Sequence, residues 1–287
     1  MKKTHLTLHL FPKEIDDYEL TVNQLKIASQ FLTNLEIDAN IILNLNDEII
    51  DWKNSKLPKD FFVDKFNKIN EKLDWINKLD DEIVFDNSCK GYLYPRIENT
   101  KLEGYDYFWW QDVDLILDDL LFYGLEQSLE QIIDTKFLIS PQIYKFWDNS
   151  WDVISSFPEK TINVDEFDAF NIKLSQHNRS ELSLYKNYNV KFAGGWFTFI
   201  SNELIKEIPW PYGYEGYGRE DTLLQEYCKK NKYPQYIMRG LVVQENRKYL
   251  SNSLYDDYVV INFEKLKKIN HNSMNKYYEV INSLWTK

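Results

Sequence analysis

The chain has 287 residues, of which 44% are hydrophobic and 16% aromatic, and its net charge is −11. This length and apolar content are enough for one sizeable core, which excludes disordered and fibrous proteins. The acidic balance, without a local basic patch, disfavours nucleic acid as a partner.

The cysteine count and the apolar runs constrain the compartment. Only Cys89 and Cys228 are present, too few for a disulfide framework, which favours a reducing, cytoplasmic setting. No apolar run reaches the roughly 18 residues of a membrane helix, so we expect no transmembrane segment. Polar residues interrupt the apolar run within the first 16 residues, which predicts a strand rather than a signal peptide.

Strand and helix patterns alternate along the N-terminal half. Residues 6–10 alternate leucine with polar residues, which predicts a strand that Pro12 ends, and apolar residues at helical spacing predict a helix within 22–32. Further strands are predicted at 37–45, 83–85 and 105–110, and a charged helix at 61–79. This order predicts an α/β protein with an open, mostly parallel sheet flanked by helices.

The chain shows no internal repeat and no Gly/Ser linker. We therefore predict one domain over residues 1–262, followed by a Lys-rich helical tail over 263–287. The lysines of the tail, Lys265, Lys267 and Lys268, fit a solvated helix face better than a membrane-binding surface.

In open α/β sheets, ligands bind beyond the carboxyl ends of the strands, so polar residues that follow apolar strands are candidate site residues. Asn46 and Asp47 follow the second predicted strand, and Asp112 follows the aromatic strand at 105–110. We expect these side chains to lie at one edge of the sheet.

The sharpest local signal is the Asp-x-Asp pair of Asp112 and Asp114. In an extended chain both carboxylates point to one side, whereas a turn between them would let one carboxylate bind a ligand without the other. Hard oxygen ligands of this kind suit Mg²⁺ or Mn²⁺. Asp-x-Asp triplets also occur by chance in acidic proteins, and only the apolar strand in front favours the functional reading here.

A second signal is the Gly- and Tyr-rich stretch 210–221, which runs into a helical pattern. Its glycines allow a backbone bent close to a ligand, and Glu220 and Asp221 fall at the predicted helix start. Ordinary helix capping by an acidic pair is the alternative. Helix capping alone, however, does not require a Gly- and Tyr-rich loop before the helix.

Taken in order, Asp112–Ile116, Gly194–Gly195 and Tyr214–Asp221 resemble the successive motifs of GT-A-fold glycosyltransferases. The likeness is nearest to the beta-1,4-galactosyltransferase type and to family 2 glycosyltransferases, and it spans roughly residues 105–246. The resemblance implies a GT-A-like α/β fold. It also implies metal-dependent, inverting transfer of a sugar from a nucleotide diphosphate donor, UDP-linked by analogy, to a carbohydrate or glycoconjugate acceptor hydroxyl.

The resemblance also implies roles for individual residues. Asp221 is the expected catalytic base, Asp112 and Asp114 the expected ligands of Mn²⁺ or Mg²⁺, and Glu220 an acceptor-binding residue. The donor would be bound by residues near the strand ends and the motifs, namely Phe11, Asn46, Asp47, Arg96, Asp112, Gly194, Gly195 and Tyr217. For Arg96, which precedes the Asp-x-Asp strand, an ordinary surface arginine is the alternative. Trp196 and Trp210 are expected to line the acceptor cleft, with core packing as their alternative.

The sequence departs from the family pattern where relatives often supply a histidine ligand to the metal. Residues 241–247 contain no histidine here, so Gln244 or Glu245 is the expected oxygen ligand, or the metal is weakly held or absent. Two rivals therefore remain open. One is a non-catalytic carbohydrate- or nucleotide-binding module with a decayed metal site; the other is a nucleotidyltransferase, which would need a Gly-rich basic loop after the first strand.

Overall fold

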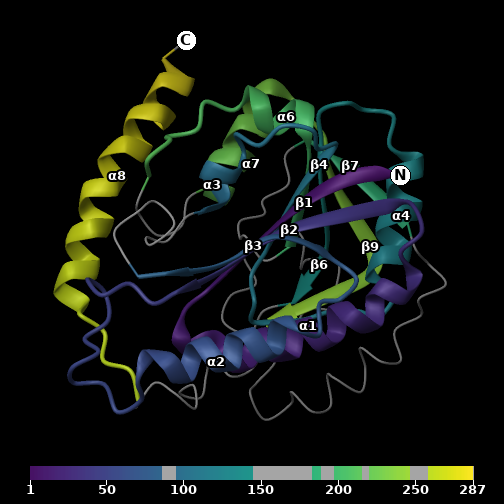
Figure 1. Ribbon diagram of the computed structural model, residues 1–287. Coiled ribbons are helices and arrows are strands. Elements are labelled where there is room, and N and C mark those ends of the chain that lie inside the picture. Colours follow the sequence, from purple (N-terminus) through teal and green to yellow (C-terminus); the bar gives the residue numbers. More distant parts are fainter. Residues whose placement is uncertain (86–94, 145–182, 189–196, 215–219, 246–257, 287) are drawn as a thin grey trace.

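The computed structural model describes residues 1–85, 95–144, 183–188, 197–214, 220–245 and 258–286. Within these ranges the chain forms a nine-stranded sheet with the order β3-β2-β1-β4-β8-β6-β9-β5, and β7 pairs with β9 (Figure 1). Its strands are β1 (Lys2–Leu10), β2 (Leu35–Asn44), β3 (Asn77–Val84), β4 (Tyr107–Gln111), β5 (Leu115–Ile116), β6 (Leu138–Tyr144), β7 (Ser183–Asn187), β8 (Phe197–Ser201) and β9 (Gln235–Glu245).

The N-terminal half of the sheet is parallel. Strand β1 pairs in parallel with β2 and with β4, and β2 pairs in parallel with β3. The direction reverses at β8, which pairs antiparallel with β4, but β6 and β9 form another parallel pair. Most paired residues lie in parallel ladders, so the predicted α/β class with an open, mixed, mostly parallel sheet is confirmed.

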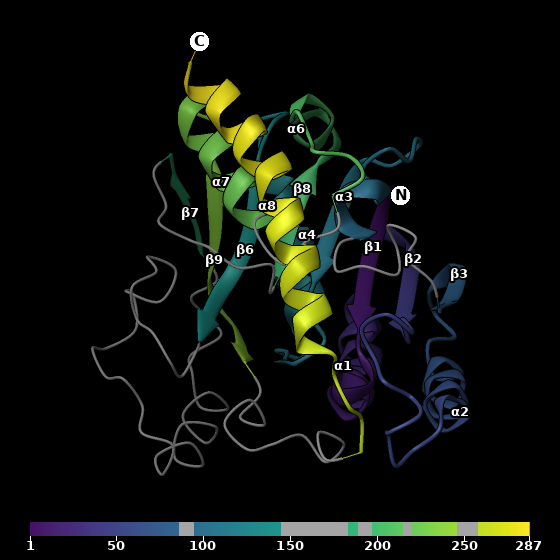
Figure 2. The same ribbon diagram turned by 90° about the vertical axis from the view of Figure 1, so that its left-hand side faces the viewer.

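Helices cover both faces of this sheet (Figures 1 and 2). Two turns of 3-10 helix, η1 (Pro12–Glu14) and η2 (Ser29–Phe31), flank α1. One face carries α1 (Ile15–Ala28), α2 (Lys59–Asn70) and α4 (Leu121–Gln131). The other carries α3 (Pro95–Asn99), α6 (Asn202–Glu207), α7 (Glu220–Asn231) and α8 (Phe263–Trp285).

The central strand β4 is buried because each of its faces meets an aromatic partner. Trp109 contacts Phe122 of α4, with ring centroids 5.5 Å apart, and Trp110 contacts Trp210 on the other face at the same distance. Successive strand residues point to opposite faces, so Trp109 packs against α4 on one face and Trp110 packs against the segment after α6 on the other. The strand therefore ends at a rigid position, with Asp112 as the next residue.

The prediction of one helix over 61–79 is wrong after Asn70. Helix α2 ends there, and β3 begins at Asn77. Leu73 and Ile76 lie in the turn between α2 and β3 and are buried in the same core, at 0% and 6% exposure. Their spacing therefore continues the helical pattern although the helix has ended. Strand β3 also begins earlier than the predicted 83–85, whereas the predicted helical C-terminal segment is confirmed as α8.

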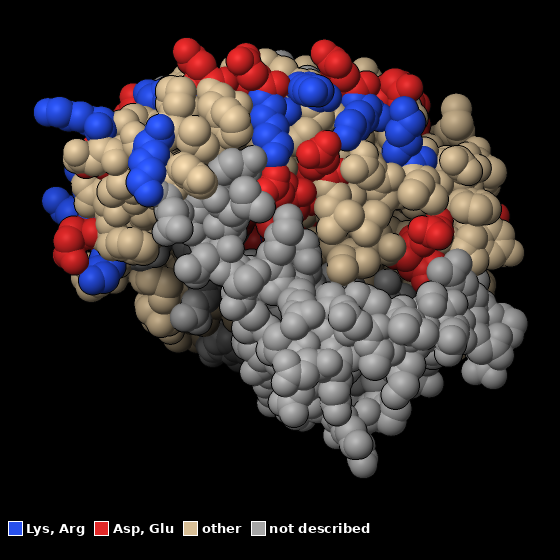
Figure 3. All heavy atoms as spheres, turned by 90° about the horizontal axis from the view of Figure 1, so that it is seen from below, with Lys and Arg blue, Asp and Glu red and all other residues tan. Residues whose placement is uncertain are grey.

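The surface that carries α1 and α2 has mixed charge. Figure 3 shows Lys and Arg side chains interspersed with Asp and Glu over the described part of the face seen from below. Lys65 of α2 forms an ion pair with Asp16 of α1, and Lys72, in the turn after α2, has its Nζ 2.8 Å from Glu19 Oε1 of α1. In the part of the chain that the structure describes, no helix has both the length and the apolar character that crossing a membrane requires.

Candidate functional site

The candidate site lies where parallel strands end together. Strands β2, β1 and β4 are neighbours and parallel, so their carboxyl ends meet at one edge of the sheet. Phe11 follows β1, Asn46 and Asp47 follow β2, and Asp112 follows β4. The sequence prediction placed Asn46, Asp47 and Asp112 at this edge, which is also where ligands bind in open α/β sheets.

Arg96 of α3 joins two of the predicted site residues. Its Nη2 donates to Asp112 Oδ1 at 2.5 Å, and its Nη1 donates to Glu220 Oε1 at 3.0 Å. The side chains of Arg96 and Glu220 are 7% and 2% exposed, whereas that of Asp112 is 35% exposed. One buried guanidinium thus ties the end of β4 to the first residue of α7, although the two carboxylates lie far apart in the sequence.

Electrostatics show that Asp221 belongs to the same cluster. Burial raises the pKa of Asp221, and the charge of Asp112 raises it further, while a hydrogen bond from the Thr222 amide and the charge of Arg96 oppose the shift. Asp221 Oδ1 accepts that amide hydrogen bond at 2.6 Å. Arg96 therefore contacts Asp112 and Glu220 directly, and Asp221, the residue after Glu220, lies within the influence of the charges of Arg96 and Asp112.

The pKa of Glu220 is also strongly raised. Burial, and next the charge of Asp221, raise its pKa to about 8 despite the opposing charge of Arg96. Its Oε2 is buried and has no hydrogen-bond partner among the described atoms. A carboxyl group in this state holds a proton near neutral pH and is available as a hydrogen-bond donor.

Two further titratable groups at this edge were not predicted from the sequence. Burial raises the pKa of Glu14 to about 7, although its Oε2 accepts the Phe11 amide N–H at 2.8 Å. Burial, together with the charge of Arg96, lowers the pKa of His9 to about 3. Glu14 stands three residues after the strand-end Phe11, a capping-box spacing that could have identified it.

The turn between β4 and β5 separates the two aspartates of the Asp-x-Asp motif. Asp112 faces Arg96, and Asp114 is buried, at 7% exposure. Strand β5 pairs with β9 so that Leu115 lies opposite Glu245 and Ile116 opposite Gln244. The backbone of both expected third ligands thus runs beside the residues that follow Asp114, and their role as ligands stays a prediction.

A divalent metal does not fit the described side chains as they are arranged. Among the described residues, no three His, Cys, Asp or Glu side chains gather in a way that could hold a metal ion. Asp112 is already bound by a cation, the Arg96 guanidinium. Asp112 would have to leave Arg96 before it could bind a metal ion.

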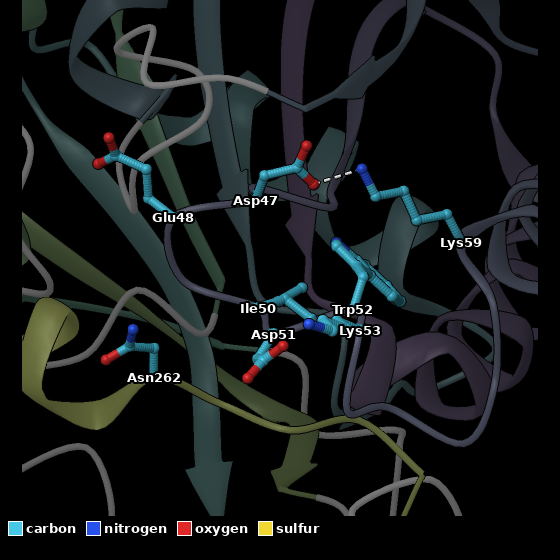
Figure 4. Close-up of a pocket in the computed structure, with 8 residues that line it drawn as sticks. All are labelled: Asp47, Glu48, Ile50, Asp51, Trp52, Lys53, Lys59 and Asn262. Carbon is cyan, nitrogen blue, oxygen red and sulfur yellow. Dashed lines mark ion pairs between the residues drawn. The ribbon is translucent and has the colours of Figure 1, made fainter.

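A cavity of about 310 Å³ opens at the carboxyl end of β2 (Figure 4). Asp47 and Lys59 point toward each other there and form an ion pair, and the Lys59 ammonium lies 5.8 Å from the centre of the Trp52 ring. The cavity is lined by charged, amide and apolar side chains: Asp47, Glu48, Ile50, Asp51, Trp52, Lys53, Lys59 and Asn262. Of the predicted donor-binding residues, it includes Asp47.

Asn46 and Trp210 make contacts inside the protein. Asn46 Oδ1 accepts the Glu48 amide N–H at 2.8 Å, a bond within the turn after β2. Trp210 is 5% exposed, and its indole N–H donates to the Ile205 carbonyl at 2.8 Å. These contacts account for both residues structurally and favour the core-packing alternative for Trp210. The remaining predicted site residues, Gly194, Gly195, Trp196 and Tyr217, lie outside the described residues.

The raised pKa values predict how stability depends on pH. Carboxyl groups with ordinary pKa values near 4.5 lose their protons in the unfolded chain by about pH 6, whereas folded Glu220 and Glu14 retain them up to about pH 8 and pH 7. The free energy of unfolding is therefore expected to fall as the pH rises from about 5 to 8. Glu220→Gln cannot ionise and should make this fall shallower in urea unfolding experiments.

A matched control for this prediction is Glu226→Gln on the same helix, where Glu226 faces Lys229 at 3.7 Å and is partly exposed. This variant should keep the slope of the wild-type protein. A slope in Glu220→Gln as steep as that of the wild type would show that Glu220 does not carry the shifted proton.

Comparisons with known proteins add little to this description. No protein-family model matches the chain, and no curated protein matches its sequence. Among solved structures the chain is similar to GalNAc-T7, crystallised with UDP, GalNAc and Mn²⁺, with 12% identity and a TM-score of 0.49. The match covers 85% of this chain and 43% of the other, so the chain spans less than half the length of that protein. A likeness at this level carries no argument about activity.

Proposed function

We propose that the protein is an inverting glycosyltransferase that moves a sugar from a nucleotide diphosphate donor, with UDP-linked sugars as the first candidates, to an acceptor hydroxyl. The observation that carries this proposal is the cluster of Asp112, Glu220 and Asp221 around Arg96 at the carboxyl edge of the sheet. The fold alone does not distinguish among functions, so the chemistry of this cluster has to support the proposal.

In the proposed reaction, Asp221 accepts the proton of the acceptor hydroxyl as its oxygen attacks the anomeric carbon. The bond from that carbon to the diphosphate breaks as the new C–O bond forms, so the configuration inverts. A carboxylate with a raised pKa is a stronger base, and burial raises the pKa of Asp221. Glu220, protonated near neutral pH, can donate a hydrogen bond to an acceptor oxygen.

The donor is proposed to lie along the same edge. Asp47 and the cavity at the end of β2 offer carboxylate and ammonium groups for its polar atoms. Phe11 follows the neighbouring strand β1, and Arg96 supplies positive charge for diphosphate oxygens. A Mn²⁺ or Mg²⁺ ion on Asp112, Asp114 and Gln244 or Glu245, as the resemblance implies, would supply further charge against the diphosphate, but it would require Asp112 to be released from Arg96.

Donor binding is the first test of this proposal. Thermal unfolding should be measured with a panel of nucleotide sugars, each with Mn²⁺ and with EDTA, because a ligand that binds the folded state raises the melting temperature. At about 100 times its Kd, a donor adds about 2.7 kcal/mol of stability, which gives a shift of several degrees. No shift with any donor in either condition would contradict the proposal.

A second candidate function is a carbohydrate- or nucleotide-binding module without turnover. The observation in its favour is that Arg96 already binds Asp112, as expected of a metal site that has lost its metal. Calorimetry with glycans and nucleotides, combined with an assay for nucleotide release, separates the two functions. Binding that does not depend on metal, together with no release, would favour the module.

A further inference from the structure

We infer that Arg96 occupies, on Asp112, the place that a divalent cation would take, so that Asp112 binds such an ion only when Arg96 is removed. The inference about the ion rests on geometry alone. Its consequence, that a diphosphate donor binds without a divalent metal, rests on the proposed function. The two parts are tested separately below.

The first support is the geometry of the guanidinium. Arg96 Nη2 lies 2.5 Å from Asp112 Oδ1, and Nη1 lies 3.0 Å from Glu220 Oε1. A planar guanidinium that bridges two carboxyl groups is held at two points, whereas a lysine ammonium would act as a single point charge. The Arg96 side chain is only 7% exposed while it makes these two contacts.

The second support is the anchoring of α3, which carries Arg96. Asn99 Nδ2 donates to Thr7 Oγ1 of β1 at 3.0 Å, and Asn40 Nδ2 of β2 donates to Asn99 Oδ1 at 3.2 Å. Ile97, the residue after Arg96 in α3, is 2% exposed and belongs to the core. Hydrogen bonds and packing thus fix the backbone of α3 against two central strands, so Arg96 does not move away with a loose segment.

The third support is the competition between positive charges. A divalent ion on Asp112 would sit next to the guanidinium, and their repulsion is strong in a partly buried site, where the effective dielectric constant is far below that of water. The described side chains also offer no group of three ligands that could compensate for this repulsion. Arg96 and a divalent ion are therefore alternative partners of Asp112.

Charge and donor geometry then give Arg96 a chemical role. A guanidinium binds phosphate oxygens as it binds carboxylate oxygens, through planar N–H groups that match two acceptors. It can therefore stabilise the negative charge of a diphosphate group without a metal ion. The ligand class assigned to this side of the site is a nucleoside diphosphate, bound by Arg96 rather than through a metal bridge.

The test uses Mn²⁺ alone as the probe, with the full chain, and measures bound ions by electron paramagnetic resonance. The wild type and Asp112→Asn should bind Mn²⁺ equally weakly. Arg96→Gln should gain affinity by about tenfold or more, and Arg96→Gln/Asp112→Asn should lose that gain. If the wild type binds Mn²⁺ and Asp112→Asn weakens this binding about tenfold, the inference is overturned, and this comparison needs no Arg96 variant.

Two further variants guard against indirect effects. Lys101→Gln removes a positive charge from the chain just after α3, where Lys101 pairs with Glu98, and it should leave Mn²⁺ affinity at the wild-type value. Arg96→Lys keeps a positive charge beside Asp112 without the planar fork, so it should gain much less Mn²⁺ affinity than Arg96→Gln. If Arg96→Gln does not fold, the comparison of the wild type with Asp112→Asn still decides the inference. A gain in Lys101→Gln as large as that in Arg96→Gln would overturn it.

The consequence for the donor is tested by calorimetry with UDP in EDTA and in Mn²⁺. Equal affinity in both conditions, lowered by about tenfold in Arg96→Gln, is the expected result. UDP binding that requires Mn²⁺ would overturn the inference. If UDP and other nucleoside diphosphates bind in neither condition, the proposed function fails, and the Mn²⁺ measurements still decide the part about Asp112.

Discussion

Asp221→Asn is expected to lower the turnover number for sugar transfer by about 10²- to 10⁴-fold, the usual contribution of a general base. The substitution keeps the size of the side chain and an oxygen that can accept the Thr222 amide N–H, but it removes the proton acceptor. Because the base acts only in the transition state, the Kd of the donor should change by less than about threefold. Steady-state kinetics and donor calorimetry measure the two quantities.

The matched control for this variant is Asp119→Asn, which makes the same chemical change at an exposed position near the start of α4. It should keep the wild-type turnover number and donor affinity. Full transfer activity in Asp221→Asn would show that another group takes the proton.

The dependence of kcat/KM on pH, on the acidic side, provides a related test of Asp221 as the base. Burial raises the pKa of Asp221, the Thr222 amide and the charge of Arg96 oppose this shift, and the charge of Asp112 adds to it. The charge of Asp221 in turn raises the pKa of the adjacent Glu220 carboxyl. Since the base must be ionised, kcat/KM should rise with pH through an apparent pKa above the usual value for aspartate, near 4. Because the two carboxyls interact, the apparent value belongs to the pair.

Trp210→Ala is expected to lower the free energy of unfolding by about 3–5 kcal/mol, the usual cost of removing a large buried aromatic side chain. Trp210 is 5% exposed, packs edge-on against Trp110 and donates its indole N–H to Ile205. The alanine leaves a cavity on the face of β4 that Trp110 occupies and leaves the Ile205 carbonyl without this partner. Urea unfolding followed by circular dichroism measures the effect.

Trp210→Phe separates the two parts of this loss. It keeps most of the packing and removes the N–H donor, so it should cost about 1–2 kcal/mol, mainly for the lost hydrogen bond and the smaller ring. A tryptophan that lined an open acceptor cleft would behave differently: its alanine variant would weaken acceptor binding and leave stability almost unchanged. That result would support the prediction that Trp210 lines the acceptor cleft.

The strands of the N-terminal half could be predicted from the sequence because their burial follows from local pattern. Leucine alternation marked β1, and the aromatic run at 105–110 marked β4, which the structure has at Tyr107–Gln111. The end of α2 could not be predicted, since Leu73 and Ile76 keep the helical spacing after the helix has stopped. Apolar spacing reports which residues reach the core and not which backbone conformation takes them there.

The candidate site was predicted in part. Strand-end position and the Asp-x-Asp spacing led to Asp112, and the acidic pair at a helix start led to Glu220 and Asp221. The bridge from Arg96 to both regions was not predicted, because it joins residues 16 and 124 positions apart and no local pattern encodes it. For the same reason the sequence suggested a metal on Asp112, whereas the structure has a guanidinium there.

The release of nucleoside diphosphate from a panel of sugar nucleotides, with mono- and disaccharides supplied as acceptors, tests the central claim most directly. The account predicts that the folded wild-type protein releases nucleoside diphosphate from at least one donor and that Asp221→Asn reduces this release by about 100-fold or more. Equal release by both proteins, or no release from any donor by a protein that is fully folded, would contradict the claim.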